Sequence, residues 1–201
     1  MNLSTKRIMM VAGPNGAGKT TTAKAFLALQ DGVYDDFLNA DEIARGLSPL
    51  HPSTVNRQAG ELMIKRFHYF LNNGMNFVFE TTAAGVSYAS HLKKAKENGY
   101  HIHITYLWLS SVEQAIKRVA LRVKQGGHNI PEEDIRRRYF RGIKNLIGLY
   151  LPLANTAIVV DNSSVEWGIG KIIAQKDAKF QLKVEDEMIW ELLQKVANEK
   201  V

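Results

Sequence analysis

Short apolar runs recur along the chain and are separated by longer segments of mixed polarity. Five of these runs are candidate strands: RIMMVA (7–12), YDDFLNA (34–40), NFVFE (76–80), HIHITYLWL (101–109) and TAIVVD (156–161). Strands that alternate with helices predict a parallel sheet covered by helices on both faces. Ligands of such sheets bind beyond the carboxyl ends of the strands.

The segments between the runs are predicted to be helical. From Val55 to Leu71, apolar residues recur at steps of three and four, and Asn73-Gly74 provides a stop signal. Helices are expected over about 18–30, 55–71, 88–97, 112–124 and 131–149.

The C-terminal tail, from about residue 165 to 201, is expected to form a short hairpin and an amphipathic helix. The apolar stripe of this helix is Met188, Ile189, Leu192, Leu193 and Val196. A chain of 201 residues is most simply one domain with a sizeable core. We therefore expect residues 1–201 to form a single α/β three-layer sandwich with a mainly parallel five-stranded sheet and this C-terminal extension.

A glycine-rich loop follows the first predicted strand and fits the pattern G-x-x-x-x-G-K-[ST] (Walker A). It consists of Gly13, Pro14, Asn15, Gly16, Ala17, Gly18, Lys19 and Thr20, and Thr21 continues into the predicted helix. Glycines let backbone N–H groups converge on phosphate oxygens, and the helix N-terminus adds partial positive charge. In this motif Lys19 reaches the β- and γ-phosphates and the Thr20 hydroxyl ligates Mg²⁺.

The strand before this loop and the helix after it favour a P-loop over the alternative, an ordinary glycine turn with an exposed lysine. The sequence therefore predicts a P-loop NTPase fold that binds ATP and Mg²⁺.

Acidic residues follow three of the predicted strands. Asp41 lies just past the second strand, Glu80 ends the third, and Asp161 ends the fifth. A carboxylate at such a place can orient an acceptor hydroxyl and take its proton. The alternatives are a helix N-cap for Asp41 and an exposed strand-end acid for Glu80. Glu80 and Asp161 are alternative candidates for the metal.

Residues 117–144 carry as much net positive charge, +6, as the whole chain. The basic residues are Lys117, Arg118, Arg122, Lys124, Arg136, Arg137, Arg138, Arg141 and Lys144. Three acids, Glu132, Glu133 and Asp134, suit the N-terminus of the helix that begins near Pro131. Two basic helices joined by Gly126-Gly127 predict a helical lid whose arginines close over phosphates. The alternative is a solvated charged face.

The composition restricts the other classes of protein. There is no cysteine, which excludes disulfides and cysteine metal sites and fits a cytoplasmic protein. No apolar stretch is long enough to span a bilayer, and no membrane partner is expected. Nucleic acid is a disfavoured partner, because only Tyr139 and Phe140 interleave aromatic rings with the arginines.

Five stretches together resemble the zeta-toxin family of P-loop kinases, especially its compact stand-alone bacterial branch. They are AGPNGAGKTT, LNADEIARGLSP, FVFETT, AIKRVALRVKQGGHNIPEEDIRRRYFRGIKNL and VVDNS. They occur in the family's order and cover roughly residues 8–163. The P-loop is shared with very many proteins, whereas the lid run is much more particular to this family.

The resemblance implies transfer of the ATP γ-phosphate to a sugar hydroxyl of a nucleotide sugar, typically UDP-N-acetylglucosamine. It implies that Asp41 activates the acceptor hydroxyl and that Arg122, Arg138 and Arg141 act with Lys19 as catalytic lid and P-loop cations. The expected acceptor-binding residues are Asp41, Arg45, Glu80 and Thr81. A protein antitoxin is an expected partner. The chain is shorter than the long toxins of the family.

Two other functions remain open from the sequence. One is a P-loop kinase of another small molecule or of a nucleic-acid end. The other is an NTP-hydrolysing switch or transport ATPase, although the signature run of transporter ATPases is not found in the sequence.

Overall fold

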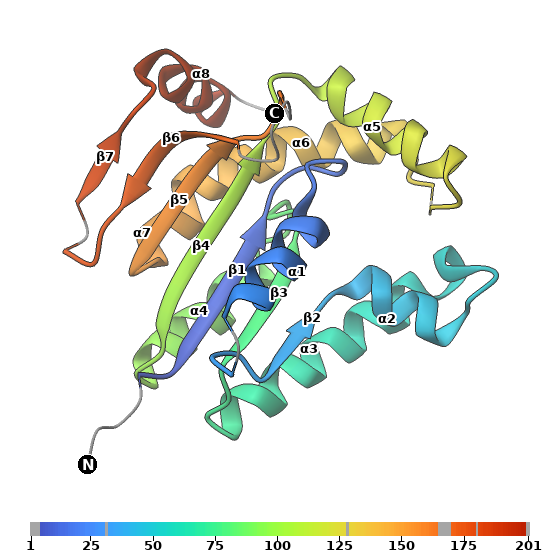
Figure 1. Ribbon diagram of the computed structural model, residues 1–201, viewed down its shortest axis with the longest axis horizontal. Coiled ribbons are helices and arrows are strands. Elements are labelled where there is room, and N and C mark those ends of the chain that lie inside the picture. The colour runs from blue at the N-terminus through green and yellow to red at the C-terminus, as the bar shows by residue number, and fades with distance from the viewer. Residues whose placement is uncertain (1–4, 31, 128, 165–169, 180, 200–201) are drawn as a thin grey trace.

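The computed structural model describes residues 5–30, 32–127, 129–164, 170–179 and 181–199. In this part of the chain, seven strands form one sheet in the order β2-β3-β1-β4-β5-β6-β7 (Figure 1). The strands are β1 (Arg7–Ala12), β2 (Asp36–Leu38), β3 (Phe77–Thr81), β4 (His101–Trp108), β5 (Thr156–Asp161), β6 (Lys171–Lys176) and β7 (Leu182–Val184). Strands β1 to β5 are parallel, whereas β6 and β7 are antiparallel to their neighbours.

The α/β fold with a mainly parallel sheet is confirmed, but the prediction of five strands is wrong. The predicted C-terminal hairpin, whose residues 165–169 lie outside the described residues, joins the sheet. Strand β6 pairs with β5 from Asp161↔Lys171 to Ala157↔Lys176. The pairing covers the edge of β5, which would otherwise present unpaired N–H and C=O groups. The sequence pattern indicated the hairpin but not the edge that it completes.

Eight α-helices connect or follow these strands in the described residues. They are α1 (Lys19–Leu29), α2 (Ala40–Leu47), α3 (Asn56–Asn72), α4 (Ser87–Glu97), α5 (Val112–Lys124), α6 (Glu132–Asn145), α7 (Leu151–Leu153) and α8 (Glu187–Asn198). A 3₁₀ turn (Pro52–Val55) precedes α3, and a π-helical turn (Leu146–Tyr150) joins α6 to α7. The helix predicted to extend from residue 131 to 149 is therefore α6 followed by the π-helical turn. None of the described helices is long and apolar enough to cross a membrane.

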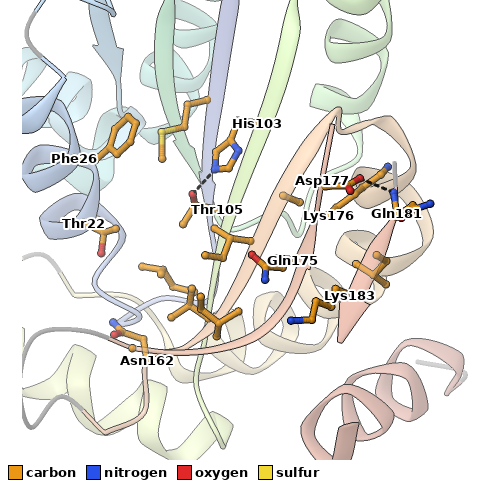
Figure 2. Close-up of a pocket in the computed structure, with 18 residues that line it drawn as sticks. Thr22, Phe26, His103, Thr105, Asn162, Gln175, Lys176, Asp177, Gln181 and Lys183 are labelled. Atoms are coloured by element: carbon orange, nitrogen blue, oxygen red, sulfur yellow. Dashed lines mark hydrogen bonds between the residues drawn. The ribbon is translucent and has the colours of Figure 1, made fainter. Parts of the chain in front are cut away.

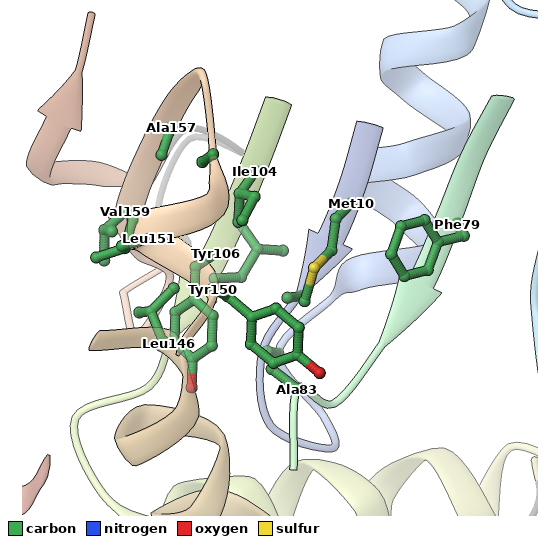
Figure 3. Packing of buried hydrophobic residues seen from close by; sticks show 14 of the residues in the cluster. Met10, Phe79, Ala83, Ile104, Tyr106, Leu146, Tyr150, Leu151, Ala157 and Val159 are labelled. Carbon is green, nitrogen blue, oxygen red and sulfur yellow. The ribbon is translucent and has the colours of Figure 1, made fainter. Parts of the chain in front are cut away.

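The main core lies on one face of the sheet. Alternate strand residues such as Met10, Phe79, Ile104 and Tyr106 point to this face, where they pack with Tyr150 (Figure 3). The opposite face is shallower over β1 and β3. There, a small cluster that includes Met9, Val11, Val78 and Ala23 packs sheet residues against α1. Because successive strand residues point to opposite faces, the sheet packs against a larger apolar core on one face and a smaller one on the other.

The second face of the sheet also carries a cavity of about 1010 Å³ between α1 and the β6–β7 hairpin (Figure 2). Its floor includes His103, whose Nδ1 lies 2.9 Å from Thr156 Oγ1 and whose Nε2 lies 3.1 Å from Thr105 Oγ1. Burial lowers the pKa of His103 to about 4, so the imidazole is neutral at neutral pH. None of the predicted site residues, all of which the structure describes, lines this cavity.

Helix α8 forms as predicted, but its buried face differs from the predicted stripe. Trp190 and Leu193 are buried, whereas Met188 is 78% exposed and Leu192 is 45% exposed. The bulky indole of Trp190 takes the central position against the core. The predicted stripe is wrong at Met188 and Leu192 because sequence spacing could not rank Trp190 above its apolar neighbours.

Helix α6 approaches the body of the protein closely at Gly142. A Cβ atom there would lie 2.7 Å from the backbone oxygen of Thr82 and 3.3 Å from the hydroxyl of Tyr106. The Tyr139 hydroxyl donates to the Leu109 carbonyl at 2.6 Å on the same side. The helix that carries the lid arginines is thus fixed to the ends of β3 and β4.

We expect Gly142→Ala to lower the free energy of unfolding by about 1–3 kcal/mol, because the new methyl group meets backbone that cannot move away. The matched control is Gly60→Ala in α3, where a Cβ atom meets nothing within 4 Å. This control should raise the free energy of unfolding by up to about 1 kcal/mol. Urea denaturation of both variants measures the difference. Equal tolerance of the two substitutions would contradict the close approach.

Candidate active site

The glycine loop has the conformation that its sequence requires. Gly13 has φ 142°, and a Cβ atom there would lie 2.2 Å from the Leu107 carbonyl oxygen. Gly16 and Gly18 have φ 78° and 85°, in the left-handed region that favours glycine. Helix α1 begins at Lys19, so its first N–H groups face the loop. The loop is therefore a backbone cradle at the end of β1.

Lys19 is the buried cation of this cradle. It is 7% exposed, and its Nζ donates to the Pro14 carbonyl at 3.0 Å and lies 3.8 Å from Glu80 Oε1. Burial lowers the pKa of Lys19 below its ordinary value, and the nearby Arg122 and Arg138 act in the same direction. The carboxylates of Glu80 and Asp41 oppose that change. These charges all act on one ammonium group.

Glu80 accepts two hydrogen bonds at its Oε2 atom. The Thr20 hydroxyl donates at 2.7 Å and the Asn39 side-chain amide donates at 2.8 Å. Asp161, the other acid considered for the metal, instead accepts at its Oδ1 from the backbone of Ser163. The structure thus brings Glu80 to the P-loop hydroxyl.

Asn39 was missed by the sequence analysis. It is 6% exposed and stands between β2 and α2, where its Oδ1 accepts from the backbone N–H groups of Asp41 at 2.8 Å and Glu42 at 3.3 Å. Asn is a favoured N-cap, so its place before a helix was an available signal. Asp41 is therefore not the cap of α2, and its side chain is left for other contacts.

A cavity of about 450 Å³ lies between the P-loop, α2, the end of β3 and the lid helices. Eight predicted site residues line it: Asn15, Gly16, Lys19, Asp41, Glu80, Thr81, Arg122 and Arg138. Tyr88 and Asn129 line it as well, and the sequence analysis assigned them no role. Half of the sixteen predicted site residues thus line one cavity.

The other eight predicted residues lie outside this lining. Five of them belong to the P-loop that borders the cavity: Gly13, Pro14, Ala17, Gly18 and Thr20. Arg141 is exposed on α6, and Thr21 is exposed in the first turn of α1. Arg45 is exposed too, and it lines an adjoining hollow of about 490 Å³. The hollow shares Ser53, Asn129 and Pro131 with the main cavity, so Arg45 lies beside the site rather than in it.

The predicted lid, residues 117–144, consists of α5, α6 and their connection, of which residue 128 lies outside the described residues. Arg136 pairs with Glu113 at 2.9 Å and with Glu132 at 2.8 Å, and Arg137 pairs with Asp134. These exposed pairs fit the alternative of a solvated face. Arg122 and Arg138 line the cavity, and Arg138 lies 3.8 Å from Asp134, which lines it too. Pro131 is the N-cap of α6 rather than its first residue.

The loop after β5 lies against the P-loop. The Asn162 side-chain amide donates to the Ala17 carbonyl at 2.7 Å, and Arg118 donates to the Ser163 carbonyl at 2.7 Å. Asn162 lies in the stretch VVDNS, where the sequence alone indicated no role for it. This hydrogen bond supports the outer side of the cradle.

The residues around the cavity fit a magnesium nucleotide. The backbone N–H groups of the glycine loop and the Lys19 ammonium are donors that suit phosphate oxygens. Within the described part of the chain, no group of three or more His, Cys, Asp or Glu residues could hold a metal. Mg²⁺ typically takes one or two carboxylates and completes its shell with phosphate oxygens and water. Thr20 and Glu80 match that requirement.

A family model described as Zeta toxin matches residues 2–166. The chain belongs to the Zeta toxin family. Membership of this family supports a kinase-type phosphotransferase, in agreement with the resemblance seen in the sequence. A relative from Haemophilus influenzae, described as an uncharacterized protein, is 35% identical over 133 residues, which are 66% of this chain and 92% of the relative.

Solved structures share the fold of this Zeta toxin family member. A chain of the AvrRxo1-ORF1:-ORF2 complex with ATP is 17% identical with a TM-score of 0.72, over 97% of this chain and 65% of that one. A chain of the PezAT toxin-antitoxin system of Streptococcus pneumoniae is 13% identical with a TM-score of 0.65, over 96% of this chain and 79% of that one. This chain thus spans about two thirds of the AvrRxo1 chain.

We expect Thr20→Ala to weaken the Mg²⁺-dependent part of ATP binding at least about tenfold, because it removes both a metal ligand of the motif and a partner of Glu80. Lys19→Ala should weaken ATP binding with and without Mg²⁺. Thr22→Ala, one half-turn further along α1, is the control. Titration calorimetry with ATP in Mg²⁺ and in EDTA measures these affinities. Unchanged Mg²⁺-dependent affinity for ATP in both Thr20→Ala and Lys19→Ala would contradict the assignment of the P-loop as the nucleotide site.

Proposed function

We propose that this protein transfers the γ-phosphate of ATP to a sugar hydroxyl of a nucleotide sugar, and that UDP-N-acetylglucosamine is the first acceptor to test. The observation that carries the proposal is the shared cavity of Asp41 and Lys19. A carboxylate that can orient a hydroxyl and a cation that can hold a γ-phosphate line the same 450 Å³ space.

On the nucleotide side, Lys19 and the N-terminus of α1 bind the phosphates. The Thr20 hydroxyl and Glu80 would hold Mg²⁺, which neutralises charge on the β- and γ-phosphates when bound. This assignment moves Glu80 from the acceptor pocket to the metal side, because its Oε2 accepts from Thr20 at 2.7 Å. It also favours Glu80 over Asp161 for the metal.

On the acceptor side, Asp41 orients the hydroxyl and takes its proton. The hydroxyl oxygen forms a bond to the γ-phosphorus while the bond to the bridging oxygen breaks, and ADP leaves. Carboxylates are weak bases at neutral pH. A weak base suffices because the loose transition state requires positioning more than early deprotonation.

Arg122 and Arg138 stabilise the charge of the transferred phosphoryl group from the lid side. Both line the cavity, and both lower the pKa of Lys19, so they lie close enough to act on the same anion. Thr81 and Tyr88 line the wall nearest the end of β3 and contact the acceptor sugar. Arg45 takes a phosphate of the acceptor in the adjoining hollow.

The proposal includes a protein antitoxin that binds this chain. The support is the resemblance in fold to a chain of the PezAT toxin-antitoxin system. Family membership is the other support.

The decisive experiment is mass spectrometry of UDP-N-acetylglucosamine incubated with the enzyme and Mg·ATP. We expect a phosphate adduct, and we expect Asp41→Asn to reduce its rate by roughly 10²–10⁴-fold while ATP binding stays unchanged. The matched control is Glu42→Gln, because Glu42 is the adjacent acid and pairs with Lys24 at 2.6 Å on the surface.

Two other results would change the proposal. Phosphorylation of a nucleoside or RNA end, without an adduct on the sugar nucleotide, would retain the kinase and discard this acceptor. ATP hydrolysis that is indifferent to every acceptor and to Asp41 would discard the kinase.

We expect Arg122→Ala and Arg138→Ala to lower the single-turnover rate by about 10³-fold, the scale of an arginine that stabilises transferred phosphate. Arg136→Ala is the control, since Arg136 pairs with Glu113 and Glu132 on the surface. Arg141→Ala distinguishes the two lines of support. The family resemblance predicts a loss of rate, whereas the exposed position of Arg141 outside the cavity lining predicts little change. Rates within a fewfold of wild type for Arg122→Ala and Arg138→Ala would make both arginines part of the solvated face.

A further inference from the structure

We propose that Asn39 is a positioning residue that joins the metal side of the site to the acceptor side. One side chain makes contacts with both halves. Its Oδ1 holds the start of α2, which carries Asp41, and its Nδ2 holds Glu80 at the end of β3. This inference rests on the proposed function only where its test measures phosphate transfer to an acceptor.

The geometry of Asn39 uses both ends of the amide. The carbonyl oxygen accepts from the backbone N–H groups of Asp41 at 2.8 Å and Glu42 at 3.3 Å. The amino group donates to Glu80 Oε2 at 2.8 Å and lies 3.5 Å from Thr20 Oγ1. At 6% exposure, the side chain has little access to water that could replace these partners.

An amide is the side-chain group that meets both demands at this place. It offers an acceptor oxygen and a nitrogen with two donor hydrogens on the same carbon. Aspartate would keep the acceptor but lose the donor toward Glu80. Serine would keep a capping oxygen, but its hydroxyl is too short to reach Glu80 as well. The residue type is thus matched to a bridge rather than to a cap alone.

The bridge limits how far two reactive parts of the site can move apart. Glu80 Oε2 is held between the Thr20 hydroxyl and the Asn39 amide, so its carboxylate has one orientation toward the P-loop. The same amide fixes the first turn of α2 and hence the backbone of Asp41. A misplacement of about 1 Å can cost about 10²-fold in rate, so this short path has a catalytic consequence.

Asn39→Ser tests the bridge because serine is as good an N-cap as asparagine. The melting temperature of the metal-free protein should stay within a few degrees of wild type. The affinity for ATP in EDTA should also stay near wild type, whereas the Mg²⁺-dependent gain in affinity should fall about 10–100-fold. With an acceptor, kcat should fall by a similar factor and the acceptor KM should change less.

Asn39→Ala removes the cap and the bridge together. It should lower the melting temperature and, beyond the effect of Asn39→Ser, reduce kcat further because the start of α2 is released. The matched control is Ser111→Ala, which removes the cap of α5, where Ser111 Oγ accepts from the Gln114 backbone N–H. That control should lose melting temperature but keep the Mg²⁺-dependent gain in affinity.

Wild-type Mg²⁺-dependent affinity and kcat in Asn39→Ser would overturn the proposal and make Asn39 a helix cap only. Equal loss of ATP affinity in Mg²⁺ and in EDTA would overturn it as well, because that result indicates general damage to the P-loop. If the wild-type protein phosphorylates no acceptor, the proposed function fails. The binding measurements, which need no acceptor, then decide on Asn39 alone.

Discussion

The burial of the Lys19 ammonium is the constraint on which the rest of the site depends. A buried cation is costly unless nearby groups compensate it. Here the Pro14 carbonyl and the Glu80 carboxylate provide that compensation, at 3.0 and 3.8 Å. The position of Glu80 is fixed in turn by Thr20 and Asn39. One desolvated charge therefore links the P-loop, the end of β3 and the start of α2.

This arrangement is available because the central strands are parallel. Strands β1, β2 and β3 end at the same edge of the sheet, so the residues that follow them meet although they are far apart in the chain. Gly13 lets the P-loop approach the Leu107 carbonyl on β4, and Gly142 lets α6 approach the Thr82 carbonyl after β3. Two glycines thus bring the loop and the lid helix within reach of one cavity.

Local sequence signals predicted the parts of the molecule that depend on neighbouring residues. The glycine loop, its strand and its helix could be predicted because φ angles and helix starts are local properties. The pairing of β6 with β5 could not, because the open edge of β5 is created by the fold. The role of Asn39 could not be predicted for the same reason, because its partner Glu80 is 41 residues away in the chain. Which face of α8 is exposed depends on Trp190, because this residue is buried in the core. The spacing of apolar residues alone cannot rank Trp190 above its apolar neighbours.

The distribution of charge over the lid gives the site its preference for anions. Arg136 pairs with Glu113 and Glu132, and Arg137 pairs with Asp134, and neither arginine is among the residues that line the cavity. Arg122 and Arg138 line the cavity with Lys19, and both lower the pKa of that lysine. Three cations so close together repel one another, and the carboxylates of Glu80, Asp41 and Asp134, the last of which lies 3.8 Å from Arg138, offset part of this repulsion. A polyphosphate placed among them converts repulsion into attraction, so the cations that destabilise the site by themselves become the source of its affinity for a nucleotide.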